Sequence, residues 1–227
     1  MNRPRFRLRR AFTLIELMVV IGLIVLLVGG LSLALNDPGT SSLAASQNTL
    51  SSLVSTTRAQ AAVQQKEARL LVYATRPPIG DGERFLRYAR VVVAETAGAT
   101  AASDFWVPVG PPVFLPRGVY IVPFNTGGLV ATGVVWPTTL PAPVSTFRTM
   151  TPARYRIRSD PPTAAADTYL WLQFSPDGTV DPPAAKIAVA TAGTANSLPQ
   201  FNNAAAVRGL TFRASGAVTR VNDAAGF

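Results

Sequence analysis

Twenty-four consecutive residues, from Phe12 to Leu35, contain a single charged side chain, Glu16. As a helix this run would be about 36 Å long at ~1.5 Å per residue, which is enough to cross a hydrocarbon core of about 30 Å with some tilt. Five arginines lie in the first ten residues, and a basic flank of this kind keeps its end of a membrane helix in the cytoplasm. We therefore expect residues 12–35 to form a single transmembrane helix that sends the rest of the chain across the membrane.

Two simple interpretations explain only part of this segment. A secretory signal peptide would use the small residues of Ser32-Leu33-Ala34 for cleavage, but the apolar run is long for a signal core and contains a carboxylate. A plain membrane anchor explains the length and the basic flank. It does not explain Glu16, because a carboxylate within such a helix costs about 2.5–3.5 kcal/mol on insertion scales.

The segment Arg9-Arg10-Ala11-Phe12-Thr13-Leu14-Ile15-Glu16-Leu17 resembles the type IV prepilin leader. In that family a basic leader, a small–aromatic junction and a glutamate at a fixed offset precede an apolar helix. The resemblance implies that a membrane-bound prepilin peptidase removes residues 1–11, including Arg9 and Arg10, by cutting between Ala11 and Phe12. The new terminus, Phe12, is then usually N-methylated. The residue before the cut is usually glycine, so Ala11 is a departure that would slow processing.

Cleavage would leave an ammonium group on Phe12 inside the membrane, four residues before Glu16. Each charge alone is expensive in lipid, whereas a paired ammonium and carboxylate largely offset one another. The resemblance implies that Glu16 pairs with the Phe12 amine of its own chain or of the next subunit. This pairing would set the axial register of a filament whose core is built from residues 12–35.

The net charge of +9 is mostly a property of the leader. The chain has 21 basic and 12 acidic residues, so loss of the five leading arginines leaves sixteen basic against twelve acidic residues, a net charge of +4. A whole-chain argument for nucleic-acid binding is thereby weakened. The absence of Cys and His excludes zinc fingers, Cys or Ser/His nucleophile pairs, haem ligation and disulfides. We expect neither an enzyme nor a cofactor.

Residues 36–72 are predicted to continue the helix as an amphipathic segment. Pro38 interrupts the pattern, since it disfavours helical geometry at Asp37, and no Pro or Gly follows between Ser41 and Val72. The residues at three/four spacing are mostly small and apolar, which suits packing against a sheet. They are Leu43, Leu50, Val54, Ala61, Ala68 and Leu71, with Gln47, Thr57 and Gln64 at the weaker positions.

Residues 73–227 are predicted to form a β-rich domain. Seventeen of the nineteen prolines lie beyond Val72, and short runs rich in Val, Ile, Phe, Tyr and Trp alternate with turn signals. Strands are predicted over residues 85–95, 105–109, 118–123, 129–136, 155–158, 169–175, 186–191, 209–214 and 217–221, with loops at 96–103, 138–145, 161–167 and 191–205. The fold class is therefore α+β: a long N-terminal helix packed on an antiparallel β-rich domain.

This arrangement resembles the pilin fold. The tail more narrowly resembles the H-type minor pseudopilin of type II secretion and the FimT-like minor pilins. Those families carry a strand ending in Phe-x-Pro-x-Gly, then an aliphatic strand, then a terminal hairpin with a glycine turn. The matching stretches here are Phe174 to Gly178, Ile187 to Val189, and Leu210 to Arg220 around Gly216.

Two further segments are candidate binding sites. Asp177 and Asp181 flank Gly178 and weakly resemble part of a calcium-binding loop. The segment lacks the alternating oxygen ligands and the closing Glu of an EF-hand. We therefore interpret these residues as part of a turn and expect no metal. Arg154, Arg156 and Arg158 would share one face of a strand and could contact phosphates, as FimT-like pilins do in DNA uptake. The competing interpretation is a solvated edge strand, whose charge blocks aggregation. On this interpretation we do not expect nucleic acid as a partner.

The resemblance implies a structural, minor subunit of a type II secretion pseudopilus, with a DNA-binding minor pilin of a type IV pilus as the alternative. Its partners would be other pseudopilins or pilins, the prepilin peptidase and the inner-membrane assembly platform. We expect a bacterial inner-membrane protein with a cytoplasmic N-terminus and a periplasmic C-terminal domain, assembled into a periplasmic or surface filament.

Overall fold

The computed structural model describes residues 14–15, 17–24, 38–77, 81–98, 105–123, 145–150, 156–157, 167–201, 203 and 205–227. The chain divides into an N-terminal unit, Met1–Pro38, and a globular unit, Gly39–Phe227. Each unit is described by itself below.

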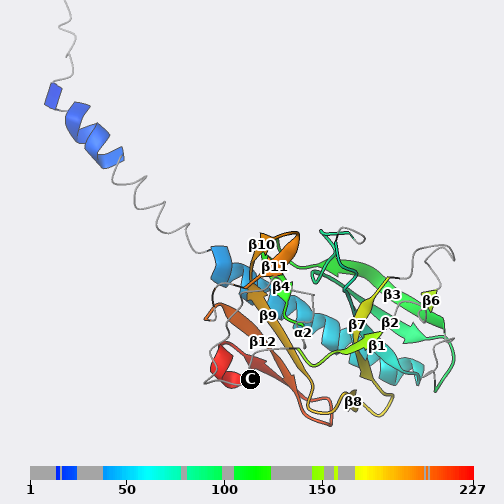
Figure 1. Cartoon of the computed structure of the whole chain (residues 1–227). Coiled ribbons are helices and arrows are strands. Elements are labelled where there is room, and N and C mark those ends of the chain that lie inside the picture. Colours follow the sequence, from blue (N-terminus) through cyan, green and yellow to red (C-terminus); the bar gives the residue numbers. More distant parts are fainter. Residues whose placement is uncertain are drawn as a thin grey trace, which may run out of the picture. The chain divides into compact units, whose positions relative to one another are not determined.

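The helix of the globular unit, α2, spans Pro38–Gln64 (Figure 1). It begins at a proline, which suits the first helical position because the missing N–H has no intrahelical partner there. Its buried side chains recur at three/four spacing, as predicted. They are Leu43, Ser46, Gln47, Leu50, Val54, Thr57 and Ala61.

The helix ends eight residues earlier than Val72, where the sequence pattern places its end. Gln65 has a left-handed φ of 53°, and the Lys66 N–H donates to the Ala61 carbonyl at 3.3 Å. This pair of features is a Schellman cap, which closes the last turn of the helix. The residues that follow form strand β1, Ala68–Tyr73, in which every residue is buried. A strand buried on both faces shows no polar–apolar alternation, so its apolar residues also fit a helical spacing.

The first sheet has the strand order β5-β7-β1-β2-β3-β6, and β8 pairs with β7. All its pairs are antiparallel except β3 with β6. Its other strands are β2 (Tyr88–Ala94), β3 (Phe105–Phe114), β5 (Arg148–Met150), β6 (Arg156–Ile157), β7 (Tyr169–Phe174) and β8 (Val180–Asp181). The predicted strand at 129–136 lies outside the described residues.

The second sheet is wholly antiparallel, in the order β13-β12-β9-β4. Its strands are β4 (Val119–Ile121), β9 (Lys186–Thr191), β12 (Val207–Phe212) and β13 (Val218–Val221). A short hairpin, β10 (Gly193–Ala195) with β11 (Leu198–Gln200), occupies the segment predicted as a loop at 191–205. Its two turn residues, Asn196 and Ser197, both have positive φ, as tight hairpin turns require. The sequence Asn-Ser is a weak signal for such a turn, so sequence reasoning misses the hairpin.

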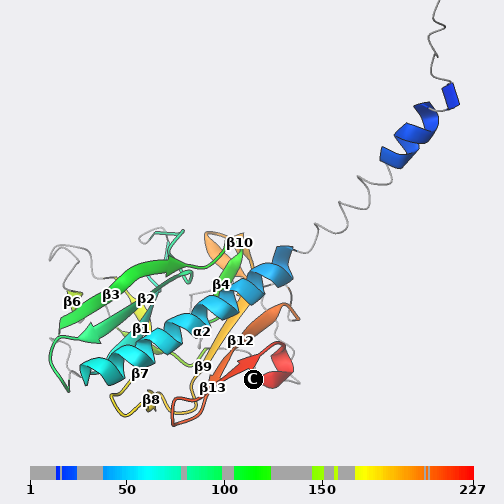
Figure 2. The same cartoon turned by 180° about the vertical axis from the view of Figure 1, so that it is seen from behind.

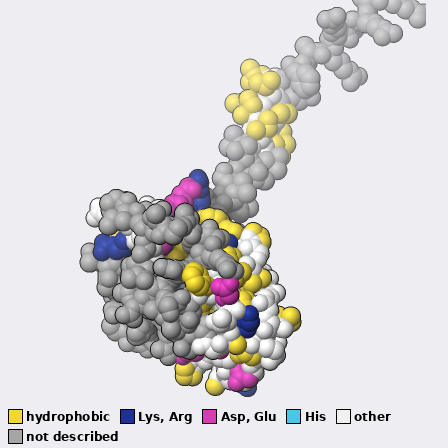
Figure 3. Space-filling model, turned by 90° about the vertical axis from the view of Figure 1, so that its right-hand side faces the viewer, with side chains coloured by type: hydrophobic (Ala, Val, Ile, Leu, Met, Phe, Trp, Pro, Cys, Tyr) yellow, Lys and Arg dark blue, Asp and Glu magenta, His cyan; other side chains and the backbone are white. Residues whose placement is uncertain are grey.

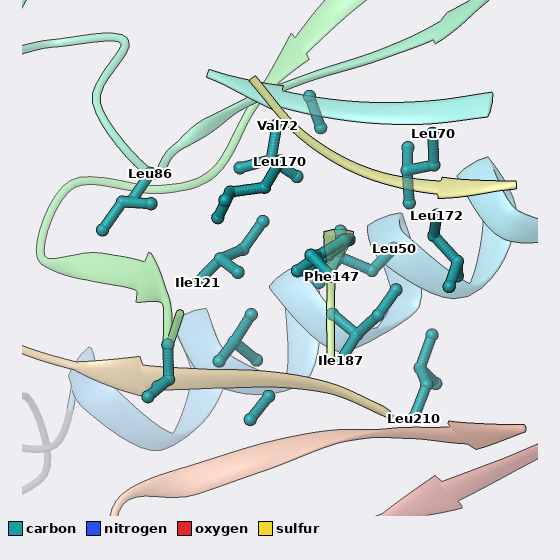
Figure 4. Packing of buried hydrophobic residues seen from close by; sticks show 14 of the residues in the cluster. Leu50, Leu70, Val72, Leu86, Ile121, Phe147, Leu170, Leu172, Ile187 and Leu210 are labelled. Atoms are coloured by element: carbon teal, nitrogen blue, oxygen red, sulfur yellow. The ribbon is translucent and has the colours of Figure 1, made fainter. Parts of the chain in front are cut away.

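One hydrophobic core joins the helix to both sheets. Figure 2 shows α2 lying across one face of the sheets, and Figure 4 shows Leu50 of α2 among side chains from each of them. The first sheet contributes Leu70, Val72, Leu170 and Leu172, and the second contributes Ile121, Ile187 and Leu210. The α+β class is confirmed: a helix packs on predominantly antiparallel strands.

Gln47 anchors the helix to the second sheet through hydrogen bonds inside this core. Its Nε2 donates to the carbonyls of Gly209 and Val221, each at 2.8 Å. Gln47→Leu leaves both carbonyls without this donor, and we expect a loss of about 1–3 kcal/mol in the free energy of unfolding. Urea unfolding of the variant measures it. Gln64, which is exposed on the same helix, is the matched control, because Gln64→Leu should change the free energy by less than about 0.5 kcal/mol.

Candidate functional site

The described part of the N-terminal unit is a helix with an apolar surface on all sides. Residues 14–15 and 17–24 are helical, and all of them except Gly22 are large apolar residues with exposed fractions between 50% and 78%. Figure 3 shows these side chains as the yellow group on the N-terminal segment. A helix that is apolar all round is normally buried in a protein core or a membrane. We therefore expect this segment to be covered by a membrane or by other protein.

The residues predicted for processing and register are Arg9, Arg10, Ala11, Phe12 and Glu16, and all of them lie outside the described residues. The same holds for residues 25–35 of the predicted span. Among the helices that the structure describes, none combines the length and the apolar character needed to cross a membrane.

The predicted arginine stripe is described at one position. Arg156 lies in β6, where it pairs with Phe105 of β3 in a parallel ladder, while Arg154 and Arg158 lie outside the described residues. Among the described strands, β6 is the last in the order of the first sheet. An edge position is what the solvated-strand interpretation requires, because charged side chains there discourage pairing with other chains.

A cluster of aromatic residues covers the face of the first sheet opposite the main core, and sequence reasoning missed it. Its members are Leu71, Tyr73, Tyr88, Val92, Ala94, Trp106, Tyr169 and Trp171. At one end, the guanidinium carbon of buried Arg69 lies 4.0 Å from the ring centroids of both Trp106 and Trp171. Its Nε donates to Gln173 Oε1 at 2.7 Å. In β1, Arg69 is enclosed by rings that desolvate and stabilise the cation.

A second arginine occupies a tyrosine cage at the other end of this cluster. The guanidinium carbon of Arg84 lies 4.4 Å from the ring centroid of Tyr73 and 4.6 Å from that of Tyr88. Burial acts to lower the pKa of Arg84, but the neighbouring Tyr169, Tyr88, Tyr73 and Asp167 outweigh it, so the pKa is raised. Asp167 also accepts a hydrogen bond from the Tyr73 hydroxyl at 3.1 Å. Arg84 thus holds its turn against the sheet as a permanent cation.

Asp177 acts as a turn residue. Its Oδ1 accepts hydrogen bonds from the Thr179 N–H at 2.9 Å and from the Thr179 hydroxyl at 2.7 Å, within the hairpin that joins β7 to β8. The backbone hydrogen bond from Thr179 is the main cause of the lowered pKa of Asp177. Across the described residues there is no group of three or more acidic side chains that could hold a metal ion.

The lowered pKa of Asp177 predicts a pH-dependent stability. The ionised carboxylate favours the folded turn, so its contribution is fully present above the unfolded value of about 3.9. It is lost as the pH falls below that value through the lower folded pKa. An NMR titration of the Asp177 carboxyl should give a pKa below that of the unfolded chain. Asp177→Asn should remove this part of the pH dependence, and an unchanged acid profile would contradict the assignment.

The two glycines of the tail motif lie against each other. A Cβ added to Gly216 would come within 2.1 Å of the Gly178 carbonyl oxygen, and both glycines have positive φ. The Val180 N–H also donates to the Ala214 carbonyl at 3.3 Å, and Arg58 of α2 lies over both turns. The motif therefore joins a hairpin of each sheet to the helix. Its function within the globular unit is structural.

Comparison with known proteins supports the N-terminal interpretation. Residues 6–32 match the family model described as the prokaryotic N-terminal methylation motif. The match contains the predicted Ala11–Phe12 junction and Glu16, so the N-terminal segment is of the prepilin type. No curated protein sequence matches the chain.

Two solved structures are similar at low identity, and both are of the type IV minor pilin FimU of Pseudomonas aeruginosa. The first, at 13% identity, covers 79% of this chain and 88% of that chain with a TM-score of 0.38. The second, also at 13% identity, covers 78% and 91% with a TM-score of 0.35.

Proposed function

We propose that the chain is a structural subunit, and a minor one, of a type II secretion pseudopilus. It would be cut by prepilin peptidase between Ala11 and Phe12, and its apolar N-terminal helix would pack with those of other subunits. Residues 12–35 would hold the subunit in the bacterial inner membrane before assembly, with the N-terminus in the cytoplasm. The globular unit would lie in the periplasm and form the filament surface.

The observation that carries this proposal is the match of residues 6–32 to the methylation motif, together with the exposed apolar surface at residues 14–15 and 17–24. A helix with this surface requires a covering, and a membrane followed by a filament core supplies one in each state. The partners would be the pseudopilins that share the core, the inner-membrane assembly platform, and the peptidase.

Intact-mass measurement of the mature protein tests the processing step. The expected mass is that of a chain beginning at methylated Phe12, because the motif directs both reactions to that residue. A chain beginning at Met1 would show that the leader is retained. A chain beginning at Leu35 would show that the segment is a signal peptide, and either result would refute the proposal.

The alternative is a minor pilin of a type IV pilus that binds DNA through Arg154, Arg156 and Arg158. The edge position of β6 is compatible with such a contact. Phosphate contacts are salt-dependent, so duplex DNA should bind residues 40–227 more weakly as the salt concentration rises. The triple substitution of these arginines by alanine should abolish this binding. If the unsubstituted domain binds no DNA, the alternative fails.

A further inference from the structure

The strand at the margin of the second sheet, β13 (Val218–Val221), has an open edge. In the described part of the chain it pairs with β12 alone, and Figure 2 shows it beside the C-terminal end of the globular unit. The side chains of Val218, Thr219 and Arg220 are exposed. Neither α2 nor another described strand therefore covers this margin, and a strand from another chain has access to it.

The backbone groups of two residues of β13 point outward from the sheet. The Arg213 N–H donates to the Ala217 carbonyl at 2.9 Å, so these two residues form a hydrogen-bonded pair of the hairpin. Such pairs alternate along an antiparallel ladder, which makes Thr219 the next residue that bonds to β12. Val218 and Arg220 lie between the bonded pairs, and their N–H and C=O groups face away from β12. An incoming strand would find two donors and two acceptors there.

Strand β3 shows how this chain closes an edge. Its neighbour β6 pairs only with Phe105 and Trp106. The Glu95 N–H donates to the Phe105 carbonyl at 2.9 Å, and the same alternation turns the backbone of Pro108 away from β2. A proline at an outward position costs the sheet no hydrogen bond and offers an incoming strand no donor. Strand β13 contains no proline, so its edge can accept a further strand.

We propose that β13 pairs antiparallel with β13 of a second copy of this chain. A twofold axis would pass beside Thr219, so that Val218 of each copy lies opposite Arg220 of the other. This register places every outward backbone group of Val218 and Arg220 opposite a partner and forms four hydrogen bonds between the copies. The four-stranded second sheet of each copy would then join that of the other in one continuous sheet.

The side chains of β13 suit pairing with a second copy. Val218 has an exposed fraction of 37%, and the aliphatic stem of the opposite Arg220 would cover it. The two arginines would lie diagonally across the strands and not directly opposite, where like charges are destabilising. The two Thr219 residues would form a close pair, and threonine pairs across strands are favourable. The strand is therefore complementary to itself.

The symmetry of this contact determines where it can operate. A twofold contact closes on itself, whereas a filament grows through contacts between unlike surfaces. The pair would thus be a form of the subunit outside the filament. The contact is small, so the dimer should be weak in solution. Anchoring of both copies in one membrane, which rests on the proposed function, would raise their effective concentration and favour pairing.

Cysteine crosslinking of the full chain in membranes tests the proposal. The chain has no Cys, so Thr219→Cys can form a disulfide only between two chains. The Cα atoms of such a non-hydrogen-bonded pair lie about 4.5 Å apart, within disulfide range. We expect a mild oxidant to give a dimer of twice the chain mass. Ala217→Cys is the matched control: Ala217 is exposed directly before β13, but the register would hold its two copies about 14 Å apart, too far for a disulfide.

Two further substitutions, made in the Thr219→Cys chain, should change the pairing in opposite directions. Val218→Pro removes an outward N–H without breaking a bond to β12, and it should lower the dimer yield at least about tenfold. Val218→Glu places a carboxylate opposite Arg220 of the second copy, and it should raise the yield about twofold or more. A misfolded variant would not raise the yield, so Val218→Glu guards against loss of structure in Val218→Pro.

Four results would each overturn the proposal: no dimer at position 219, an equal yield at position 217, a disulfide to a different protein, or a yield that does not rise with Val218→Glu. The intact mass of the crosslinked chain reports cleavage between Ala11 and Phe12 separately. A failure of the pairing is therefore distinguished from a failure of the proposed processing.

Discussion

Replacing Glu16 by alanine should leave cleavage between Ala11 and Phe12 intact and reduce incorporation of the mature chain into filaments at least about tenfold. The reason is the ammonium that the proposed cleavage would create at Phe12. Without a carboxylate four residues away, that charge must enter an apolar environment unpaired, at a cost of about 2.5–3.5 kcal/mol. The proposed cleavage site lies before the apolar helix, so processing should be unaffected.

Intact mass reports cleavage in this experiment, and quantification of the subunit in sheared or purified filaments reports incorporation. Glu16→Gln is the matched control, because it keeps the shape of the side chain and removes its charge. It should assemble as poorly as Glu16→Ala if charge pairing sets the register. Normal incorporation of either variant would refute the pairing role, and loss of cleavage would show that Glu16 is read by the peptidase instead.

The most local signals in the sequence are the most informative about structure. The run Lys186–Thr191 is predicted as a strand and is β9 with the same bounds, because its aliphatic residues are bracketed by Pro- and Ala-rich turns. The buried face of α2 is predicted through Ala61, including polar Gln47 and Thr57. In both segments the hydrophobic pattern and the local backbone preference indicate the same secondary structure, and tertiary packing is consistent with it.

Prediction fails where long-range contacts decide the structure. Ala68 and Leu71 continue the helical spacing of α2, yet they belong to a strand that lies between β7 and β2. Its pairing partners are separated from it by up to about a hundred residues of chain. A local sequence pattern does not indicate partners at that distance. The spacing also places Gln64 on the buried stripe, but Gln64 is exposed, since the helix ends there.

The candidate surfaces divide in the same way. The prepilin motif is contiguous, so the sequence alone locates its junction and Glu16. The aromatic cluster of the first sheet draws on four strands, and one of its ring contacts joins Tyr73 to Tyr169, 96 positions later. Nothing in the local spacing of these tyrosines indicates that they meet.

A large loss of stability from a single methyl group is expected for Gly216→Ala. Gly216 has a φ of +72°, and an added Cβ would lie 2.1 Å from the Gly178 carbonyl oxygen. That oxygen belongs to backbone in a tight turn with φ of +84° at Gly178, so it cannot move without opening the contact between the two hairpins. We expect the free energy of unfolding to fall by about 3–4 kcal/mol, the sum of left-handed strain and overpacking.

Gly110→Ala separates these two effects. Gly110 has a similar φ of +70°, but nothing lies within 4 Å of its added Cβ, so the substitution introduces the left-handed strain alone, about 1–2 kcal/mol. Urea unfolding of residues 39–227, followed by tryptophan fluorescence, measures both variants. Equal losses would show that the two turns separate at little cost. A loss about 1–3 kcal/mol greater for Gly216→Ala than for Gly110→Ala would show that the contact between the glycines holds the hairpins of the two sheets together, which is the physical reason for the two glycines of the tail motif.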